Sequence, residues 1–148
     1  MARQNPYDDL VMDHIKNARN YRALDGADRR SHGSNPLCGD EVNVFLRMDR
    51  DRIADAAFQC SCCGISMASA SMMTESVRGL SVAEAHDRIR ALVALIDAQP
   101  DGTKEGADEI ERALLATVRE FPARKRCAAL PWITLEAALA NRSEAAFS

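Results

Sequence analysis

Two kinds of hydrophobic pattern follow one another along this chain, and their order limits the folds that it can form. Over residues 41–48 apolar and polar side chains alternate, which is typical of a strand with one buried face. The charged residues 49–52 then predict a tight turn, and residues 53–58 a second strand. So short a connection makes the two strands antiparallel. A third, earlier strand within 22–31 has only weak support.

Apolar residues recur at helical spacing over most of the chain that follows. Helices are predicted over 66–78, which ends at a glycine, from the capping-box sequence 81–84 onwards, and over 107–118. A further helix is predicted over 7–16, and Pro131 predicts the start of a C-terminal helix. Strands followed by a run of helices indicate an α+β fold, with a small antiparallel sheet of about three strands and helices on one face.

Length and charge narrow the function classes. The 148 residues suit a single domain over 1–148 with one core. A formal charge of −3 argues against nonspecific nucleic-acid binding, which needs a basic surface. The apolar runs are too short to span a bilayer, and the first ten residues lack the apolar segment of a secretory signal. We therefore expect a cytoplasmic protein that binds neither nucleic acid nor membrane.

Five cysteines lie in three places, each at the end of a predicted element. Cys38 precedes the first strand, three thiols lie within 60–63 after the second, and Cys127 follows the basic run 124–126. An odd number of cysteines in a cytoplasmic chain does not indicate a disulfide framework, and metal or sulfur chemistry is favoured. Because the first two places flank a hairpin, they should be neighbours. Cys127 can join them only through tertiary packing.

Three sulfur atoms and the carboxylate of Asp40 offer a four-ligand set for zinc or iron. The thiolate form is favoured at Cys63 by the following helix N-terminus and at Cys127 by the preceding cations. A carboxylate is more easily displaced than a fourth thiolate, so such a site can open, as a relay or scaffold requires. Two other interpretations stay open: inert buried cysteines, and a closed structural zinc site.

Four segments resemble motifs of the iron–sulfur assembly proteins IscU, SufU and NifU. Residues 35–40, NPLCGD, resemble the NPxCGD motif, and residues 63–75, CGISMASASMMTE, resemble the GCxIxxASxS segment in its SufU form. Residues 13–20, with Tyr7, are similar to the N-terminal helix and its DHYxNPRN signature. Residues 121–127, FPARKRC, resemble the SufU segment before its last cysteine. Together these segments extend over nearly the whole chain.

The resemblance implies an α+β fold, in agreement with the hydrophobic pattern, and a site built from Cys38, Asp40, Cys63 and Cys127. In SufU-type members this set binds Zn²⁺, and the protein accepts persulfide sulfur from a SufS-type cysteine desulfurase. The last cysteine, here Cys127, is the implied acceptor. In IscU-type members the equivalent set holds a nascent [2Fe–2S] cluster, or iron, for transfer to downstream apo-iron–sulfur proteins.

Departures from the family pattern favour the SufU branch and leave one question open. Arg126 stands where IscU proteins have histidine, the IscU LPPVK motif is absent, and the segment 79–127 is longer than in IscU. Cys60 and Cys62 stand where the family usually has glycine. They are either tolerated neighbours, or extra metal ligands or a second sulfur-holding pair. If the strand continues through this loop, they share a face and Cys63 points away.

The predicted function is therefore an iron–sulfur cluster assembly scaffold and zinc-dependent sulfur acceptor, at most a sulfurtransferase in the sense of a persulfide relay. The alternative is a zinc-stabilised binding module without sulfur transfer. A hydrolase with Cys127 as nucleophile is disfavoured because no histidine lies near it in sequence. We expect a helix-surface or packing role for His14, packing roles for the methionines of 66–78, and a core or partner contact for Trp132. Arg124 and Lys125 are expected to steer an acidic partner.

Overall fold

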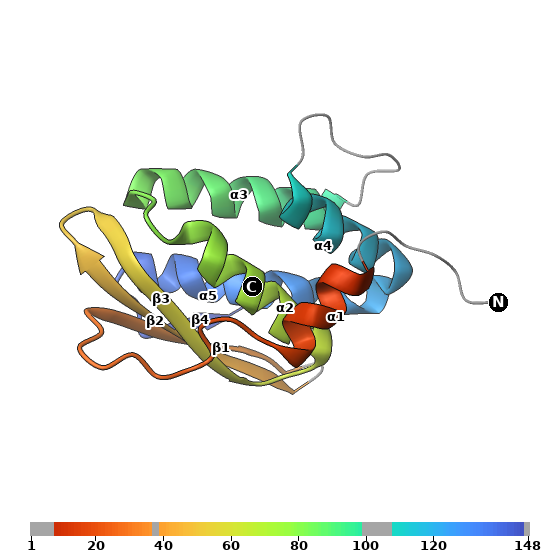
Figure 1. Cartoon of the computed structure of the whole chain (residues 1–148), viewed down its shortest axis with the longest axis horizontal. Helices are drawn as coiled ribbons and strands as arrows, with labels where there is room; N and C mark the ends of the chain where they lie inside the picture. The colour runs from red at the N-terminus through yellow and green to blue at the C-terminus, as the bar shows by residue number, and fades with distance from the viewer. Residues whose placement is uncertain (1–7, 37–38, 99–107, 147–148) are drawn as a thin grey trace.

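The computed structural model describes residues 8–36, 39–98 and 108–146, in which one face of a sheet is covered by helices (Figure 1). The strand order is β3-β2-β1-β4, and the neighbouring strands are antiparallel except β1 and β4, which are parallel. The predicted α+β class with helices on one face is confirmed. The described strands are β1 (Arg29–Asn35), β2 (Asp40–Asp49), β3 (Arg52–Ser61) and β4 (Glu144–Ala146).

The helices form two tiers above this sheet. They are α1 (Asp8–Lys16), α2 (Gly64–Val77), α3 (Val82–Ala98), α4 (Glu109–Glu120) and α5 (Lys125–Leu139), with the short 3-10 helix η1 (Pro122–Arg124) before α5. Helices α2 and α5 pack directly on the sheet, α3 packs on α5, and α1 packs on α2. No helix within the described ranges is long and apolar enough to cross a bilayer.

The hairpin of β2 and β3 follows the sequence prediction closely. Val42, Val44 and Leu46 are fully buried on the helix-covered face, as the alternation predicts. Asp40 lies on the same face two residues before Val42, so its carboxylate is directed under the helices and is buried. The turn contains no glycine, and Arg50 adopts the left-handed conformation at φ 59° that the turn requires.

Strand β1 begins near the end of the weakly predicted window 22–31 and continues beyond it to Asn35, and β4 was not predicted. The sequence of β1 has almost no apolar side chains, but its backbone pairs with β2 along its whole length, from Arg29 opposite Leu46 to Asn35 opposite Asp40. Gly33 lets α5 approach closely, since a Cβ there would lie 2.0 Å from Thr134 Oγ1. Pairing and close packing therefore form this strand where side-chain pattern does not.

The apolar residues of α2 and α5 form the centre of the core. Met72, Met73 and Trp132 are fully buried, which confirms packing for the two methionines and the core position of Trp132. The Trp132 indole Nε1–H donates to Ser69 Oγ at 3.0 Å. His14 is also buried, and its Nδ1 lies 2.7 Å from Ser71 Oγ on α2.

The predicted start of the last helix at Pro131 is wrong. Helix α5 begins six positions earlier, at Lys125, and Pro131 lies inside it. Proline has no backbone N–H, so the carbonyl of Cys127, four residues earlier, has no donor from Pro131. The hydroxyl of Ser66 on α2 lies 2.8 Å from this carbonyl oxygen and donates to it. A tertiary hydrogen bond thus replaces the helical one that Pro131 cannot make, and the helix continues through a proline that in the sequence resembles a helix start.

Candidate functional site

The structure brings Asp40, Cys63 and Cys127 together although they are far apart in sequence. Their carboxylate oxygen and two sulfur atoms all lie within 4.8 Å of one another. Asp40 is the first residue of β2, Cys63 is the N-cap of α2, and Cys127 lies in the first turn of α5. Cys38, the other cysteine of the expected set, lies outside the described residues. Asn35 and Asp40, on either side of its segment, are paired across β1 and β2.

Asp40 is fixed by donors from the start of α2. Its Oδ1 accepts the backbone N–H of Cys63 at 3.1 Å, and its Oδ2 lies 2.9 Å from the hydroxyl of Ser66. Asp40 is only 5% exposed. The free N–H groups and the positive dipole end of α2 stabilise its negative charge. The position of the carboxylate is therefore set by both the strand alternation and the helix start.

Ser66 links all three members of the cluster, and the sequence analysis gave it no role. Its Oγ contacts Asp40 Oδ2 at 2.9 Å and the Cys127 carbonyl oxygen at 2.8 Å, and the Cys63 thiol lies 3.8 Å away as a donor to it. A hydroxyl has one proton, so it donates to one of the two oxygens at a time. The signal that could have revealed this role is a serine three residues after Cys63 together with a proline four residues after Cys127.

The two thiols differ in exposure but share one electrostatic setting. Cys127 is 1% exposed, whereas Cys63 is only partly buried, and neither is in a disulfide. Each lies at the N-terminal end of a helix, where the helix dipole favours a negative charge. Two helix N-termini therefore converge on the same cluster of potential anions.

Arg124 supplies a full positive charge beside these groups. A hydrogen bond with Cys127, and then the negative charges of Cys63, Cys127 and Asp40, raise the pKa of the Arg124 guanidinium above its usual value. Arg124, expected from the sequence to steer a partner, lies against the thiols. Its charge offsets part of the negative charge that two thiolates and a carboxylate would accumulate.

The donor set fits a thiophilic metal ion. Zinc binds cysteine sulfur at about 2.3 Å in tetrahedral geometry, which puts neighbouring ligand atoms about 3.8 Å apart. The three described ligand atoms, all within 4.8 Å of one another, need only small side-chain movements to reach this spacing. Three ligands leave one tetrahedral position, for which the sequence suggests Cys38. Sulfur donors equally suit iron and iron–sulfur clusters.

Cys60 and Cys62 form a disulfide with a Cα–Cα distance of 5.5 Å, although the sequence did not indicate disulfides. The physical reason is that Cys60 lies in β3 and Cys62 directly follows its last residue, Ser61, so the backbone brings the two Cα atoms to a separation that a disulfide can bridge. In this oxidised form neither sulfur is a thiolate ligand. Their role as extra metal ligands stays a prediction that concerns the reduced pair.

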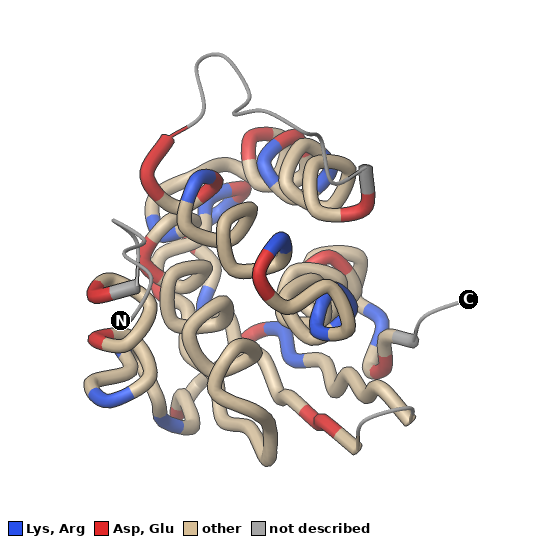
Figure 2. Tube along the Cα trace, turned by 90° about the vertical axis from the view of Figure 1, so that its right-hand side faces the viewer, with Lys and Arg blue, Asp and Glu red and all other residues tan. Residues whose placement is uncertain are grey.

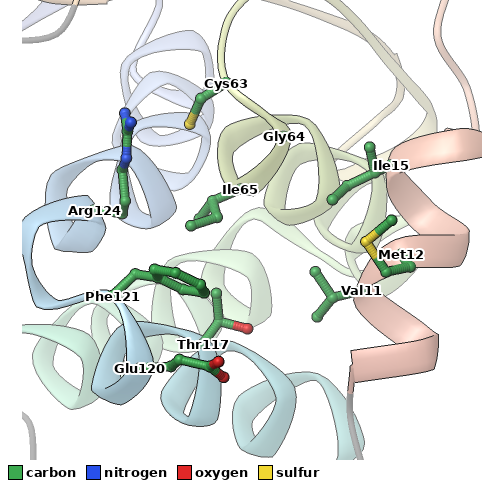
Figure 3. Close-up of a pocket in the computed structure, with 10 residues that line it drawn as sticks. All are labelled: Val11, Met12, Ile15, Cys63, Gly64, Ile65, Thr117, Glu120, Phe121 and Arg124. Carbon is green, nitrogen blue, oxygen red and sulfur yellow. The ribbon is translucent and has the colours of Figure 1, made fainter. Parts of the chain in front are cut away.

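A pocket of about 560 Å³ opens beside Cys63 (Figure 3). Side chains of α1 form one wall, and Phe121 and Ile65 extend toward them from the other side, while the Cys63 sulfur and the Arg124 guanidinium lie together at one end. Two large apolar side chains of this pocket are exposed, Met12 at 46% and Phe121 at 49%. The residues lining the pocket are Val11, Met12, Ile15, Cys63, Gly64, Ile65, Thr117, Glu120, Phe121 and Arg124.

Charged residues of both signs are mixed along the described chain. Figure 2 shows Lys and Arg segments interspersed with Asp and Glu segments on the helices, without a single basic stripe. This distribution agrees with the formal charge of −3.

Known proteins are similar to this chain in both sequence and fold. The chain is 35% identical over 135 residues to the zinc-dependent sulfurtransferase SufU of Bacillus subtilis, covering 91% of this chain and 90% of that protein. It is 35% identical over 136 residues to the iron–sulfur cluster assembly scaffold protein IscU of Streptococcus pyogenes, covering 92% and 84%.

The fold matches a crystal structure from Fervidobacterium islandicum, described as an iron–sulfur cluster assembly scaffold protein for the SUF system. The TM-score is 0.77 at 30% identity, covering 90% of this chain and 96% of that chain. The NifU-like N terminal domain family model matches residues 6–141, and these matches confirm the resemblance noted in the sequence. The chain therefore belongs to the NifU-like N-terminal domain family, in which SufU and IscU are among its relatives.

Proposed function

We propose that this protein is an iron–sulfur cluster assembly scaffold that accepts persulfide sulfur at Cys127 from a SufS-type cysteine desulfurase. The observation that carries the proposal is the cluster of Asp40, Cys63 and Cys127, whose two thiols lie at helix N-termini beside Arg124. The names of its relatives, a zinc-dependent sulfurtransferase and a cluster assembly scaffold, support the same assignment. The cytoplasm is the compartment that we propose, because thiols stay reduced there.

Asp40, Cys63, Cys127 and, from the sequence, Cys38 would hold Zn²⁺. When bound, zinc would keep the thiols in their thiolate form at neutral pH. Ser66 and the N–H of Cys63 keep the Asp40 carboxylate oriented toward the two sulfurs. Iron or a [2Fe–2S] cluster assembled on the same residues would be the cargo that passes to apo-proteins.

Sulfur transfer is a thiol exchange in which electrons and atoms balance. The Cys127 thiolate attacks the outer sulfur of the desulfurase persulfide, a new S–S bond forms, and the old S–S bond breaks. The desulfurase cysteine leaves as a thiolate, and Cys127 carries the persulfide. Arg124, which is hydrogen-bonded to Cys127, stabilises the anionic sulfur before and after the transfer.

The pocket next to Cys63 is the proposed docking place for the desulfurase segment that presents the persulfide. The pocket is mostly apolar, opens at the site, and carries the exposed Phe121 at its edge. Exposed aromatic residues beside a pocket are frequent anchors of protein interfaces. We expect Phe121→Ala to weaken desulfurase binding by roughly tenfold or more. Phe45→Ala is a matched control, because Phe45 lies on the β2 face that the helices do not cover.

The decisive experiment is to incubate the purified protein with a SufS-type desulfurase and cysteine, then alkylate, digest and locate added sulfur by mass spectrometry. We expect one added sulfur on the Cys127 peptide, and none there in Cys127→Ser. Zinc that stays bound while no sulfur is added would contradict the proposal and favour a zinc-stabilised binding module.

A further inference from the structure

We propose that Cys60 and Cys62 form a dithiol that reduces the persulfide at the site to sulfide, and that their disulfide is the oxidised product of that reaction. The inference rests on the proposed function, because it needs a persulfide on Cys127. It adds a second activity, persulfide reduction, to sulfur acceptance. Sulfur in a persulfide is more oxidised than the sulfide of a cluster, so assembly needs such a step.

The pair lies directly beside the thiol cluster. Cys62 immediately precedes Cys63, and neighbouring Cα atoms are 3.8 Å apart. The Cys63 sulfur lies within 4.8 Å of the Cys127 sulfur. A persulfide on Cys127 would extend that side chain by one S–S bond, about 2 Å, toward the segment that carries Cys62 and Cys63. Residues 62 and 63 lie between β3 and α2, outside regular structure, so their side chains are not bound to strand alternation.

The backbone holds the two residues ready for reversible disulfide formation. Cys60 is paired with Val42 in the sheet, and the Tyr21 hydroxyl donates to its carbonyl at 2.9 Å and accepts its N–H at 3.3 Å. The Cα atoms of Cys60 and Cys62 are 5.5 Å apart, a usual separation for a disulfide. The pair can therefore open and close by side-chain rotation alone.

The surroundings favour a reactive role over a structural one. A disulfide stabilises a fold mainly by closing a long loop, and this one spans a sequence separation of only two residues. Disulfides in cytoplasmic proteins are usually transient and catalytic or redox-sensing. Cys60 and Cys62 are both only partly buried, so a reductant can reach the pair, and the Cys60 sulfur lies 4.0 Å from Met67 Sδ in the first turn of α2.

The chemistry balances without an outside reactant for one turnover. The Cys62 thiolate attacks the outer sulfur of the Cys127 persulfide, which breaks that S–S bond and returns Cys127 to a thiolate. The Cys60 thiol then attacks Cys62 Sγ, forms the Cys60–Cys62 disulfide and releases the outer sulfur as hydrosulfide. Two cysteine sulfurs together lose two electrons, and the released sulfur gains both. An external dithiol reductant would reset the pair.

The test uses the full chain, reduced with a dithiol, desalted without oxygen, and mixed with a desulfurase that has been given one equivalent of cysteine. Released sulfide, persulfide on Cys127 and the Cys60–Cys62 disulfide are measured on the same samples. Wild type should release about one sulfide per chain as the disulfide forms. Cys60→Ser/Cys62→Ser should keep the persulfide on Cys127 and release at least about tenfold less sulfide. Ser61→Ala, which changes the exposed residue between the two cysteines and leaves both thiols, should behave as wild type.

The outcomes separate this inference from the function on which it rests. A persulfide on Cys127 that is equally abundant in wild type and the double variant, with equal sulfide release, overturns the inference and leaves the proposed function standing. Absence of persulfide from Cys127 in the double variant overturns both. Zinc content and circular dichroism of each variant show that the fold is retained, and Cys60→Ala/Cys62→Ala repeats the test if the serine variant does not fold.

Discussion

The β2–β3 hairpin holds two carboxylates in opposite ways, Asp40 near its open end and Asp55 toward its turn. Asp55 makes ion pairs with Arg22 and Arg78, both at 3.0 Å. Asp40 receives neutral donors, the Cys63 N–H and the Ser66 hydroxyl. Two arginines pair directly with Asp55, whereas the neutral donors at the start of α2 orient Asp40 toward the thiols. The difference shows how the same residue type serves stability in one place and suits a metal ligand in the other.

Replacing the carboxylate that faces the thiols should have the largest effect. Asp40→Asn keeps an oxygen acceptor but removes the charge, so zinc affinity should fall by at least about tenfold, since even outer partners of metal ligands are worth about 10–100-fold. Competition with a chromophoric chelator measures the affinity. Unchanged affinity would show that Asp40 is not a zinc ligand, and the proposed contrast between Asp40 and Asp55 would no longer hold.

Ser66→Ala tests whether the site depends on the bridging hydroxyl. It leaves the buried Cys127 carbonyl without its donor from α2, which should cost about 1–3 kcal/mol of unfolding free energy and also lower zinc affinity. Ser69→Ala is the matched control one turn later, because Ser69 Oγ donates in the same way to the Ala128 carbonyl at 2.6 Å. Urea unfolding and chelator competition should show lost stability in both variants but lost zinc affinity only for Ser66→Ala.

Asp55→Asn should give the opposite result from Asp40→Asn. Removing a partly buried charge that pairs with two arginines should cost about 1–3 kcal/mol of stability while zinc affinity stays unchanged. Burial alone would raise the pKa of Asp55, but its bonds from Arg22 and the Ala56 N–H and the charge of Arg78 outweigh this and lower it. Its contribution should therefore be present above about pH 4 and be lost as the pH falls through the lowered pKa. Urea titrations from pH 7 to pH 3 that find no loss specific to wild type would refute this assignment.

The smallest expected effect concerns His14, far from both carboxylates in sequence. Burial, and then the charge of Arg19, lower the pKa of His14, although Glu75, Asp13 and Glu109 act in the opposite direction. The fold therefore prefers neutral His14, and its stability should be complete above about pH 6.5 and decrease as the pH falls below that value. His14→Gln should flatten this part of the curve. Equal pH slopes in wild type and variant between pH 7.5 and pH 5 would contradict the assignment.

The parts of the fold that depend on local pattern were predictable. Alternation in 41–48 identified β2 and its buried face, and the glycine-free turn and the following helix starts appeared within a few residues of their predicted positions. The thiols at element ends were also predictable, because a hairpin returns its ends to the same edge of a sheet. The structure brings Asp40 and Cys63 together as that topology requires, and the packing of α5 adds Cys127.

The parts that depend on tertiary contacts were not predictable. Strand β1 is held by pairing with β2 and by the space at Gly33, neither of which leaves an apolar pattern. Pro131 looked like a helix start because the Ser66 bond that compensates it comes from a segment 61 residues away from Cys127 in the chain. The Cys60–Cys62 disulfide depends on the backbone path at the end of β3, where Cys60 lies in the strand and Cys62 just beyond it, and the residue types alone do not determine this path.

Pro131 also affects the helical turn that carries the buried thiol of Cys127. The first turn of α5 lacks one helical hydrogen bond, because Pro131 has no N–H for the Cys127 carbonyl. Helix α2 holds this turn through the hydroxyls of Ser66 and Ser69. This turn can therefore detach as a unit while the rest of α5 stays on the sheet, and its amides should exchange with solvent faster than those beyond Pro131. A partner that competes for the two hydroxyls needs to release one helical turn, rather than unfold the domain, to reach Cys127.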